Sequence, residues 1–235
     1  MSKKTRLIGA LAVSILIPLT CFIVISQLSK GKLHLPKYYV VDHVVTSPEG
    51  TNDTVYHQVA EATFTNQFGE EVSLNKDLKG KILVIDFIFT TCPTVCPQLT
   101  NNMEVIQHAF RKDPKRKSRL DTAIHFISIT VDPERDSFPV MRKYADDHNV
   151  NRKNWWFLTG SRADIYNYAR KELRVNVGKG GEGVDDFLHT QKIVVLDTMR
   201  YIRGYYDGLD TADMIRCTDD IVILTKQKYR KKEND

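Results

Sequence analysis

The pattern of hydrophobic and polar positions separates an apolar amino-terminal run from a longer region of alternating strand and helix patterns. Residues 7–26 contain no charge. Twenty helical residues at about 1.5 Å each cover a hydrocarbon core of roughly 30 Å, whereas the apolar part of a signal peptide is usually about 7–15 residues long. No small-x-small cleavage site follows Leu28, and the sequence Pro-Leu-Thr before Cys21 fits a lipoprotein signal poorly. We therefore expect an uncleaved transmembrane anchor over residues 7–28.

A short basic head predicts the orientation of this anchor. Residues 1–6 carry three bases and no acid, so the positive-inside rule keeps them in the cytoplasm. Lys30, Lys32 and Lys37 weaken this argument, because the far flank is basic too. A head this short is typical of a bacterial protein without a mitochondrial transit peptide. We expect a single-pass protein of the bacterial cell membrane with its carboxy-terminal domain on the extracytoplasmic (periplasmic) side.

The pattern after the anchor predicts one domain. A juxtamembrane segment over residues 29–58, with a short strand within 38–45, comes first. Nearly continuous apolar runs then alternate with segments of helical periodicity, and such runs are typical of strands buried on both faces. Strands are expected over residues 62–65, 72–74, 82–89, 123–131, 155–158, 192–196 and 201–206, and helices over 95–112, 137–145, 161–173 and 210–224.

This order of elements predicts an α/β fold over residues 59–225, with a mixed sheet flanked by helices. A basic tail, residues 226–235, is expected to be a solvated end. The tail and residues 1–30 hold the excess of positive charge, so the net charge of +5 leaves about −2 for residues 31–225. That balance is ordinary for a soluble domain, and we expect no nucleic-acid partner.

The cysteines are the candidate chemical groups. Cys21 lies in the predicted anchor and is expected to be inert, and Cys217 lies in a helical pattern and is expected to be a small buried apolar residue. Cys92 and Cys96 lie at the turn between the strand over 82–89 and the next helix, where exposed N–H groups and the helix dipole favour a thiolate. In an oxidising compartment such a pair forms a disulfide unless a metal or a reductant intervenes. The pair predicts a redox-active dithiol or part of a soft-metal site, with a structural disulfide as the simpler alternative.

A metal site at this turn needs a third ligand, because two sulfurs leave the coordination of most metals incomplete. His189 follows a glycine-rich stretch, residues 178–183, and precedes the strand over 192–196. By position alone it is as well explained as an ordinary loop-end residue. Surface or partly buried roles suffice for His34, His43, His57, His108 and His148, and His125 opens a strand far from that strand's carboxyl end.

Three separated motifs resemble those of the Sco/SenC proteins, the copper-delivering assembly factors of cytochrome c oxidase. Residues 86–97 (DFIFTTCPTVCP) look like the family's signature. Residues 128–136 (SITVDPERD) are similar to its second motif, and residues 187–190 (FLHT) to its histidine motif. The resemblance covers roughly residues 60–225 and implies a thioredoxin-like fold.

The resemblance also implies roles for four residues. Cys92, Cys96 and His189 would bind copper, and Asp132 would act from beside the ligands. Two thiolates and one imidazole suit copper, and soft sulfur favours Cu(I). A Cys₂His set with an open position also describes a catalytic zinc site, which an extracytoplasmic reactive dithiol makes less attractive.

The expected function is that of a metallochaperone rather than an enzyme. A membrane-anchored copper chaperone would deliver copper to the copper centre of cytochrome c oxidase. Its partners would be the copper-accepting subunit of the oxidase, an upstream copper donor and a thiol reductant. The alternative is a thiol–disulfide oxidoreductase that reduces the cysteines of the accepting partner and needs only Cys92 and Cys96. A peroxiredoxin-type peroxidase, disfavoured by the short cysteine spacing, and a binding module with a structural disulfide are further alternatives.

Overall fold

The computed structural model divides the chain of 235 residues into two compact units, Met1–His34 and Leu35–Asp235. It describes residues 14–22, 24, 36–48, 50–110, 120–148, 150–175 and 190–233. In the first unit the described residues are helical. Across the described ranges, no helix is both long enough and apolar enough to cross a membrane. Part of the anchor predicted over residues 7–28 lies outside these ranges.

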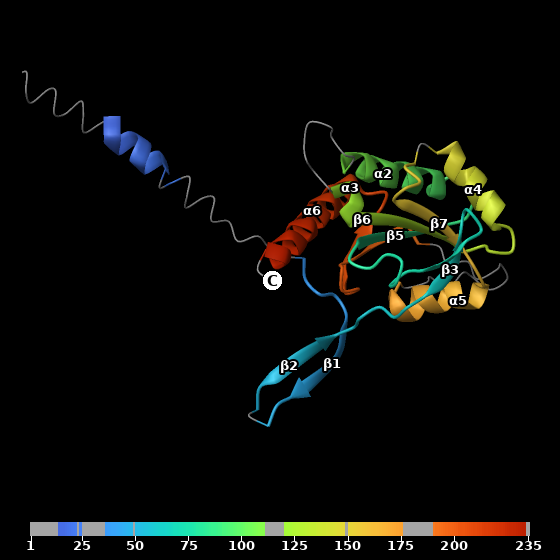
Figure 1. Cartoon of the computed structure of the whole chain (residues 1–235), viewed down its shortest axis with the longest axis horizontal. Helices are drawn as coiled ribbons and strands as arrows, with labels where there is room; N and C mark the ends of the chain where they lie inside the picture. The colour runs from blue at the N-terminus through green and yellow to red at the C-terminus, as the bar shows by residue number, and fades with distance from the viewer. Residues whose placement is uncertain are drawn as a thin grey trace, which may run out of the picture. The chain divides into compact units, whose positions relative to one another are not determined.

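The second unit is built on a mixed β-sheet (Figure 1). Within the described residues the strand order is β4-β3-β7-β6-β5-β8-β9. The three central strands β5, β6 and β7 are parallel, and the strands on either side of them pair antiparallel. The strands are β3 (Thr63–Asn66), β4 (Glu71–Ser73), β5 (Ile82–Ile88), β6 (Ile124–Thr130), β7 (Trp155–Thr159), β8 (Lys192–Leu196) and β9 (Ile202–Asp207).

Helices cover both faces of this sheet. Side chains of α2 (Val95–Ala109), α4 (Phe138–Asp147) and α6 (Thr211–Glu233) pack against one face. Those of α5 (Arg162–Asn167) and the π-helical turn η1 (Tyr168–Glu172) pack against the other, and Figure 1 shows α2 and α5 on opposite sides of the sheet. Successive side chains of a strand point to opposite faces. In β5, Ile82, Val84 and Ile88 therefore join the first layer, and Leu83, Ile85 and Phe87 join the second.

The order of strands and helices predicted for this domain is confirmed, and so is the burial of β5 and β6 on both faces. Some boundaries differ. The largest difference is at the end of α6, which runs to Glu233 instead of ending at Leu224. The residues after Leu224 include no glycine or proline and are mostly good helix formers, so nothing in the basic tail stops the helix. A short helix before β6, α3 (Leu120–Ala123), has no counterpart among the predicted elements.

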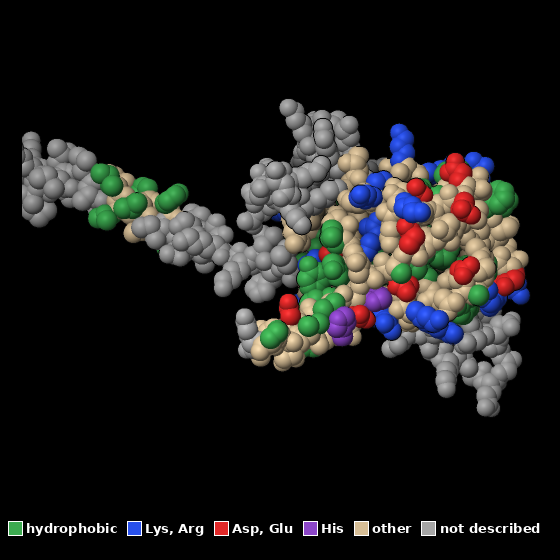
Figure 2. Space-filling model, turned by 60° about the horizontal axis from the view of Figure 1, so that its bottom comes forward, with side chains coloured by type: hydrophobic (Ala, Val, Ile, Leu, Met, Phe, Trp, Pro, Cys, Tyr) green, Lys and Arg blue, Asp and Glu red, His purple; other side chains and the backbone are tan. Residues whose placement is uncertain are grey.

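A two-stranded hairpin precedes the sheet where one short strand was expected. It pairs β1 (Val41–Thr46) with β2 (Asn52–Tyr56), and their residues are almost all exposed. Figure 2 shows apolar side chains along this hairpin. Its base is tied to the sheet, because the N–H of Tyr39 donates to the carbonyl of Ile202 (3.1 Å) and the guanidinium of Arg203 donates to the carbonyl of Pro36.

Candidate metal centre

The predicted strand-to-helix turn brings the two cysteine side chains together. Cys92 follows the end of β5, and its N–H donates to the carbonyl of Phe89 (3.1 Å), which closes a turn. Helix α2 begins at Val95, so Cys96 lies in its first turn. The nearly continuous apolar sequence of β5 favours this arrangement, because the strand is buried on both faces up to its last residue.

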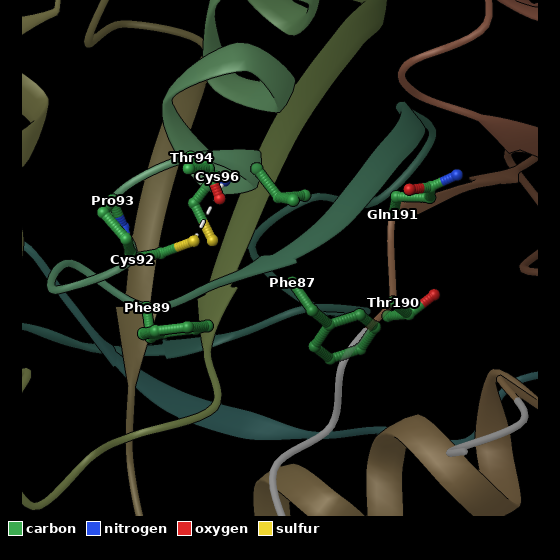
Figure 3. A pocket seen from close by; sticks show the side chains of 9 residues that line it. Phe87, Phe89, Cys92, Pro93, Thr94, Cys96, Thr190 and Gln191 are labelled. Atoms are coloured by element: carbon green, nitrogen blue, oxygen red, sulfur yellow. Dashed lines mark hydrogen bonds between the residues drawn. The ribbon is translucent and has the colours of Figure 1, made fainter. Parts of the chain in front are cut away.

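A cavity of about 350 Å³ opens beside the two cysteines (Figure 3). Two segments far apart in the sequence form its walls. One is the end of β5 with the following turn, and the other is the pair of residues before β8. Figure 3 shows the sulfur atoms of Cys92 and Cys96 close to each other, with Thr190 and Gln191 coming from the second segment. The lining residues are Phe87, Phe89, Cys92, Pro93, Thr94, Val95, Cys96, Thr190 and Gln191.

The sulfur of Cys92 takes the place of a helix cap. The first N–H groups of a helix have no carbonyl partner within it. At the start of α2, the side chain of Thr94 makes no capping hydrogen bond. Instead, the N–H of Cys96 donates to Sγ of Cys92 at 3.4 Å. The helix therefore offers its free donors to a sulfur atom, as the sequence predicted for a thiolate at this turn.

The two thiols differ in their surroundings. Burial alone would raise the pKa of Cys92, but hydrogen bonds from the backbone N–H groups of Cys96, Thr94 and Val95 and from the Cys96 thiol bring the pKa below its ordinary value. Burial raises the pKa of Cys96 to about 12. Both are free thiols in this structure. Cys92, the more exposed of the two, is therefore the readier nucleophile, and Cys96 is held protonated behind it.

A buried carboxyl group lies on the same face of the sheet. Asp86, in the middle of β5, is fully buried, and the hydroxyl of Ser128 donates to it at 2.6 Å. The indole N–H of Trp155 in turn donates to that hydroxyl at 3.0 Å. Burial raises the pKa of Asp86 to about 7, although the hydrogen bond from Ser128 opposes the shift. An ionised Asp86 would in turn disfavour a thiolate at Cys96.

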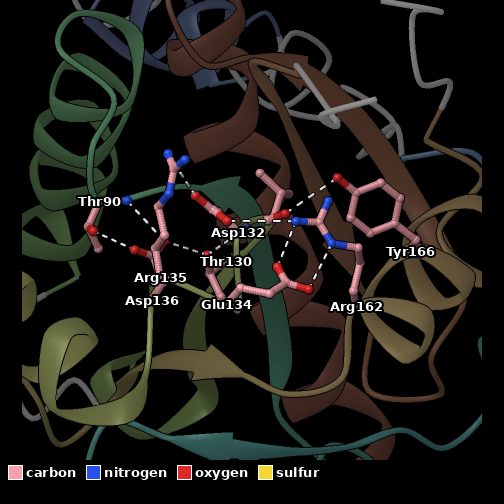
Figure 4. Close-up of polar contacts among 9 residues, drawn as sticks. Thr90, Thr130, Asp132, Glu134, Arg135, Asp136, Arg162 and Tyr166 are labelled. Carbon is pink, nitrogen blue, oxygen red and sulfur yellow. Dashed lines mark hydrogen bonds and ion pairs between the residues drawn. The ribbon is translucent and has the colours of Figure 1, made fainter. Parts of the chain in front are cut away.

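Asp132 lies in the next loop along the carboxyl edge of the sheet, not in the cavity wall (Figure 4). Its carboxylate is buried and pairs with Arg135 at 3.6 Å and with Arg162 at 3.7 Å. Arg162 also donates two hydrogen bonds to Glu134, at 2.9 and 2.6 Å. The structure therefore places Asp132 in an ion-pair cluster at the loop that follows β6.

Asp136, in the same loop, is the acid that contacts the cysteine-bearing turn, and the sequence prediction missed it. Its carboxylate accepts hydrogen bonds from the N–H of Thr90 (3.0 Å) and from the hydroxyls of Thr90 (2.5 Å) and Thr130 (2.6 Å). Asp136 falls within the motif over residues 128–136, so its presence was visible. Nothing in that motif tells which of its acids faces the turn before Cys92.

His189, the predicted third ligand, lies outside the described residues, as does the glycine-rich stretch 178–183. Thr190, its neighbour in the sequence, lines the cavity. Within the part of the chain that the structure describes, no three His, Cys, Asp or Glu side chains are grouped as a metal site would require. The described part of the candidate centre is thus a pair of sulfurs that face one cavity.

The fold and the site together define a thioredoxin-like protein with a dithiol at the start of the helix that follows a central strand. Residues 51–222 match the family model described as SCO1/SenC. This match spans well over half of the chain, and the chain belongs to the SCO1/SenC family.

Curated relatives support this assignment. A SCO1 protein homolog of Bacillus subtilis is 32% identical over 171 residues, which are 72% of this chain and 82% of the relative. A mitochondrial SCO1 homolog 1 of Arabidopsis thaliana is 33% identical over 66% of this chain and 43% of its own length. The mitochondrial SCO2 homolog of Danio rerio matches over 40% of its length. The chain thus spans most of the Bacillus relative but less than half of these two mitochondrial ones.

Solved structures of SCO1/SenC proteins also resemble this chain. A SCO1/SenC family lipoprotein from Bacillus anthracis has a TM-score of 0.61 at 26% identity, covering 79% of this chain and 99% of that one. A second structure is that of BsSco, with a TM-score of 0.59 at 30% identity, covering 74% of this chain and 96% of that one. BsSco is described as having a disulfide switch and as a member of the Sco family of cytochrome c oxidase assembly proteins. The copper-bound ScoI of Bradyrhizobium japonicum has a TM-score of 0.52 at 28% identity, covering 68% of this chain and 98% of that one.

Proposed function

We propose that this protein is a copper chaperone that carries Cu(I) on Cys92, Cys96 and His189 and delivers it to the copper centre of cytochrome c oxidase. The observation that carries the proposal is the pair of free sulfurs that faces one cavity at the start of α2. Thr190, on another wall of that cavity, is bonded to His189. Two relatives at 28% identity or more are described as copper-bound or as oxidase assembly proteins, which supports the same cargo and acceptor.

The chemistry of the donors fits this cargo. Thiolate sulfur is a soft ligand that selects Cu(I), and imidazole suits copper as well. Cys92 already lies among N–H donors that stabilise its thiolate, whereas Cys96 must lose a proton when the metal binds. Copper loading should therefore release protons and weaken as the pH falls. A three-ligand set leaves the metal accessible on one side, which suits a carrier that must give it up.

Asp132 is proposed to act on the centre without contacting the metal. Its buried carboxylate lies in the loop after β6, at the same edge of the sheet as the cysteines, and is paired with two arginines. A negative charge at that position would change the electrostatic potential at the cavity, and with it the binding of a cation. We expect an Asp132→Asn variant to fold and to bind copper about tenfold more weakly, within the range usual for residues that support metal ligands.

The anchor over residues 7–28 and the extracytoplasmic position of the domain are part of the proposal. They rest on the charge-free run 7–26 and the basic head over residues 1–6. The Bacillus anthracis relative is named a lipoprotein, which raises a different attachment, through a lipid on a cysteine. Membrane fractionation followed by intact-mass analysis separates the two. The proposed anchor predicts an unprocessed membrane-bound chain, and cleavage before Cys21 with added lipid mass contradicts it.

A thiol–disulfide exchange role is the second candidate, and the difference between the two thiols favours it. The Cys92 thiolate would attack a disulfide of the partner and form a mixed disulfide. The Cys96 thiol, on losing its proton, would displace the partner's remaining thiolate. The products are a Cys92–Cys96 disulfide and a partner dithiol, so two electrons move to the partner and two protons are taken up by its thiolates. This activity needs no histidine.

A competition titration tests the chaperone proposal. Reduced protein competes with a Cu(I) chelator of known affinity, and the bound fraction gives the dissociation constant. We expect one Cu(I) per chain and a loss of affinity of at least about tenfold in His189→Ala. The matched control is His43→Ala, which removes an exposed histidine on β1. Equal affinities in the wild type and His189→Ala would rule out the three-ligand site and leave the dithiol role.

A further inference from the structure

Asp136 is a buried acid whose hydrogen-bond partners are all uncharged. It is fully buried in the loop between β6 and α4. One of its oxygens accepts from the hydroxyl of Thr90, and the other accepts from the N–H of Thr90 and the hydroxyl of Thr130. None of the ion pairs found among the described residues includes it. A carboxylate stripped of water is stable only when its lone pairs are used, so these three donors account for its presence there.

Two of these three donors belong to one residue, and that residue lies two positions before Cys92. Asp136 therefore holds both the backbone and the side chain of Thr90, which restrains the turn in two directions. The turn is closed at its other end by the hydrogen bond from the N–H of Cys92 to Phe89. The sulfur of Cys92 is in turn placed 3.4 Å from the N–H of Cys96. Figure 4 shows Thr90 and Asp136 facing each other across the two loops.

The loop that carries Asp136 is itself firmly held. The N–H of Asp136 donates to the carbonyl of Asp132 (2.9 Å), and the N–H of Asp132 donates to the hydroxyl of Thr130 (3.0 Å). Thr130 is the last residue of β6, which pairs with β5 along its whole length. The carboxylate of Asp136 is thus anchored to β6, and the two hydrogen bonds that it accepts from Thr90 link the cysteine-bearing turn to the same strand.

We propose that Asp136 is a positioning residue of the metal centre: through Thr90 it holds Cys92 at the distance from Cys96 that lets both sulfurs bind one metal ion. The proposal rests on the proposed function for its copper readout, but the spacing of the two thiols can be measured without copper. A purely structural link between the two loops would stabilise the fold and leave the properties of the dithiol unchanged.

The central variant is Asp136→Asn, which keeps the shape of the side chain and one acceptor oxygen. Its amide nitrogen cannot accept from the hydroxyl of Thr90 and can only donate to that oxygen, and its neutral carbonyl is a weaker acceptor than a carboxylate, so both restraints on the turn are weakened. Thr90→Val is the second variant. It keeps the backbone donor and removes the hydroxyl, and it remains informative if the first variant fails to fold. The matched control is Asp197→Asn, which changes another buried acid, in the turn between β8 and β9, that accepts from Met199, Tyr201 and Arg203.

Two quantities are measured on the full chain, together with the melting temperature. The first is the equilibrium constant for oxidation of Cys92 and Cys96 by glutathione disulfide at pH 7. In this reaction the two thiols become one disulfide, and glutathione disulfide takes up the two electrons and two protons as two glutathione molecules. The second is the Cu(I) affinity by chelator competition. We expect Asp136→Asn to change the oxidation constant by about tenfold and to weaken copper binding by about 10–100-fold, with Thr90→Val smaller in both.

The control variant shows whether a change in the oxidation constant or in the Cu(I) affinity is caused by the position of Cys92 or by a general loss of stability. Asp197→Asn is expected to lower the melting temperature by a similar amount while its oxidation constant and copper affinity stay at wild-type values. If Asp136→Asn and Thr90→Val change only the melting temperature, the positioning role is wrong and the link is structural. If the wild type binds no copper but the oxidation constant of Asp136→Asn is still shifted, the positioning role stands and the copper proposal fails.

Discussion

Cysteines occur in two contrasting surroundings within the second unit of the chain. Cys92 and Cys96 lie at the carboxyl edge of the sheet, at the start of α2, beside a cavity. Cys217 lies inside α6 and is fully buried in the core that the same helices form. Burial raises the pKa of Cys217 well above its ordinary value, whereas hydrogen bonds outweigh burial at Cys92.

The difference follows from helix geometry. Within a helix each N–H bonds to the carbonyl four residues earlier, so a sulfur there finds no free donor. In front of a first turn the N–H groups are unpaired, and Cys92 uses them. The same residue type therefore has a stabilised thiolate in one place and is a small apolar side chain in the other.

Replacement of either edge cysteine should have the largest effect. Cys92→Ser or Cys96→Ser removes a soft ligand, and we expect Cu(I) affinity to fall by more than about a hundredfold, beyond the loss usual for residues that only support the ligands. Chelator competition measures it. Cys217→Ser is the matched control and should bind copper like the wild type. Strong copper binding in both edge variants would place the metal elsewhere.

Alkylation of the thiols should follow the same contrast. In a Cys21→Ser background, Cys92 should react with iodoacetamide first, because it is partly exposed and its thiolate is stabilised, and Cys96 should react more slowly. Cys217 should be protected until the domain unfolds. Peptide mass spectrometry over time gives the three rates. Labelling of Cys217 at the rate of Cys92 in native protein would contradict the buried environment.

A buried histidine should make the stability of the domain depend on pH. His125 packs against Trp156 on the face opposite α2, and its ring nitrogens make no hydrogen bond within the described part of the chain. Burial lowers its pKa to about 3, and nearby Lys81 adds to the shift. The unfolded chain binds the proton first, near pH 6.5, so stability should fall as the pH drops from there towards 3, by up to roughly 5 kcal/mol.

The variant His125→Phe tests this, because it keeps a flat ring without a titratable group. Urea unfolding at several pH values should show a flatter stability profile between pH 6.5 and 3 than in the wild type. An unchanged slope would mean that other groups cause the acid sensitivity.

Asp86 should affect the pH dependence of stability in the opposite direction to His125. Burial raises its pKa to about 7, so between its ordinary value and pH 7 the folded state holds a proton that the unfolded state has lost. Stability should therefore decline as the pH rises through this range, by a few kcal/mol at most. Asp86→Asn should remove this decline, as measured by the same urea series. A decline of wild-type size in Asp86→Asn would contradict a protonated Asp86.

The smallest effect is expected at Cys217. Cys217→Ala removes one buried sulfur and should lower the free energy of unfolding by about 1 kcal/mol. Copper affinity and the oxidation constant of the edge pair should stay unchanged. A change in either one would mean that the core around α6 and the edge pair of cysteines are coupled.

Local patterns predicted most of the domain. The apolar runs over β5 and β6 and the helical periodicity of α2 were enough to place Cys92 and Cys96 at a strand-to-helix turn. The predicted end of the last helix at Leu224 is wrong, because the lysines and arginines of the basic tail favour helix and α6 continues to Glu233. The contact between Asp136 and Thr90 could not be predicted, since it depends on how two loops 46 residues apart meet in space. His189 remains a prediction from the motif over residues 187–190.

Copper K-edge X-ray absorption spectroscopy of the Cu(I)-loaded protein, in the wild type and in His189→Ala, identifies the ligand atoms of the proposed copper site. We expect two sulfur ligands and one nitrogen ligand in the wild type, with the nitrogen lost and both sulfurs kept in the variant. A wild-type spectrum without two sulfur ligands, or a nitrogen ligand that persists in His189→Ala, would contradict this expectation.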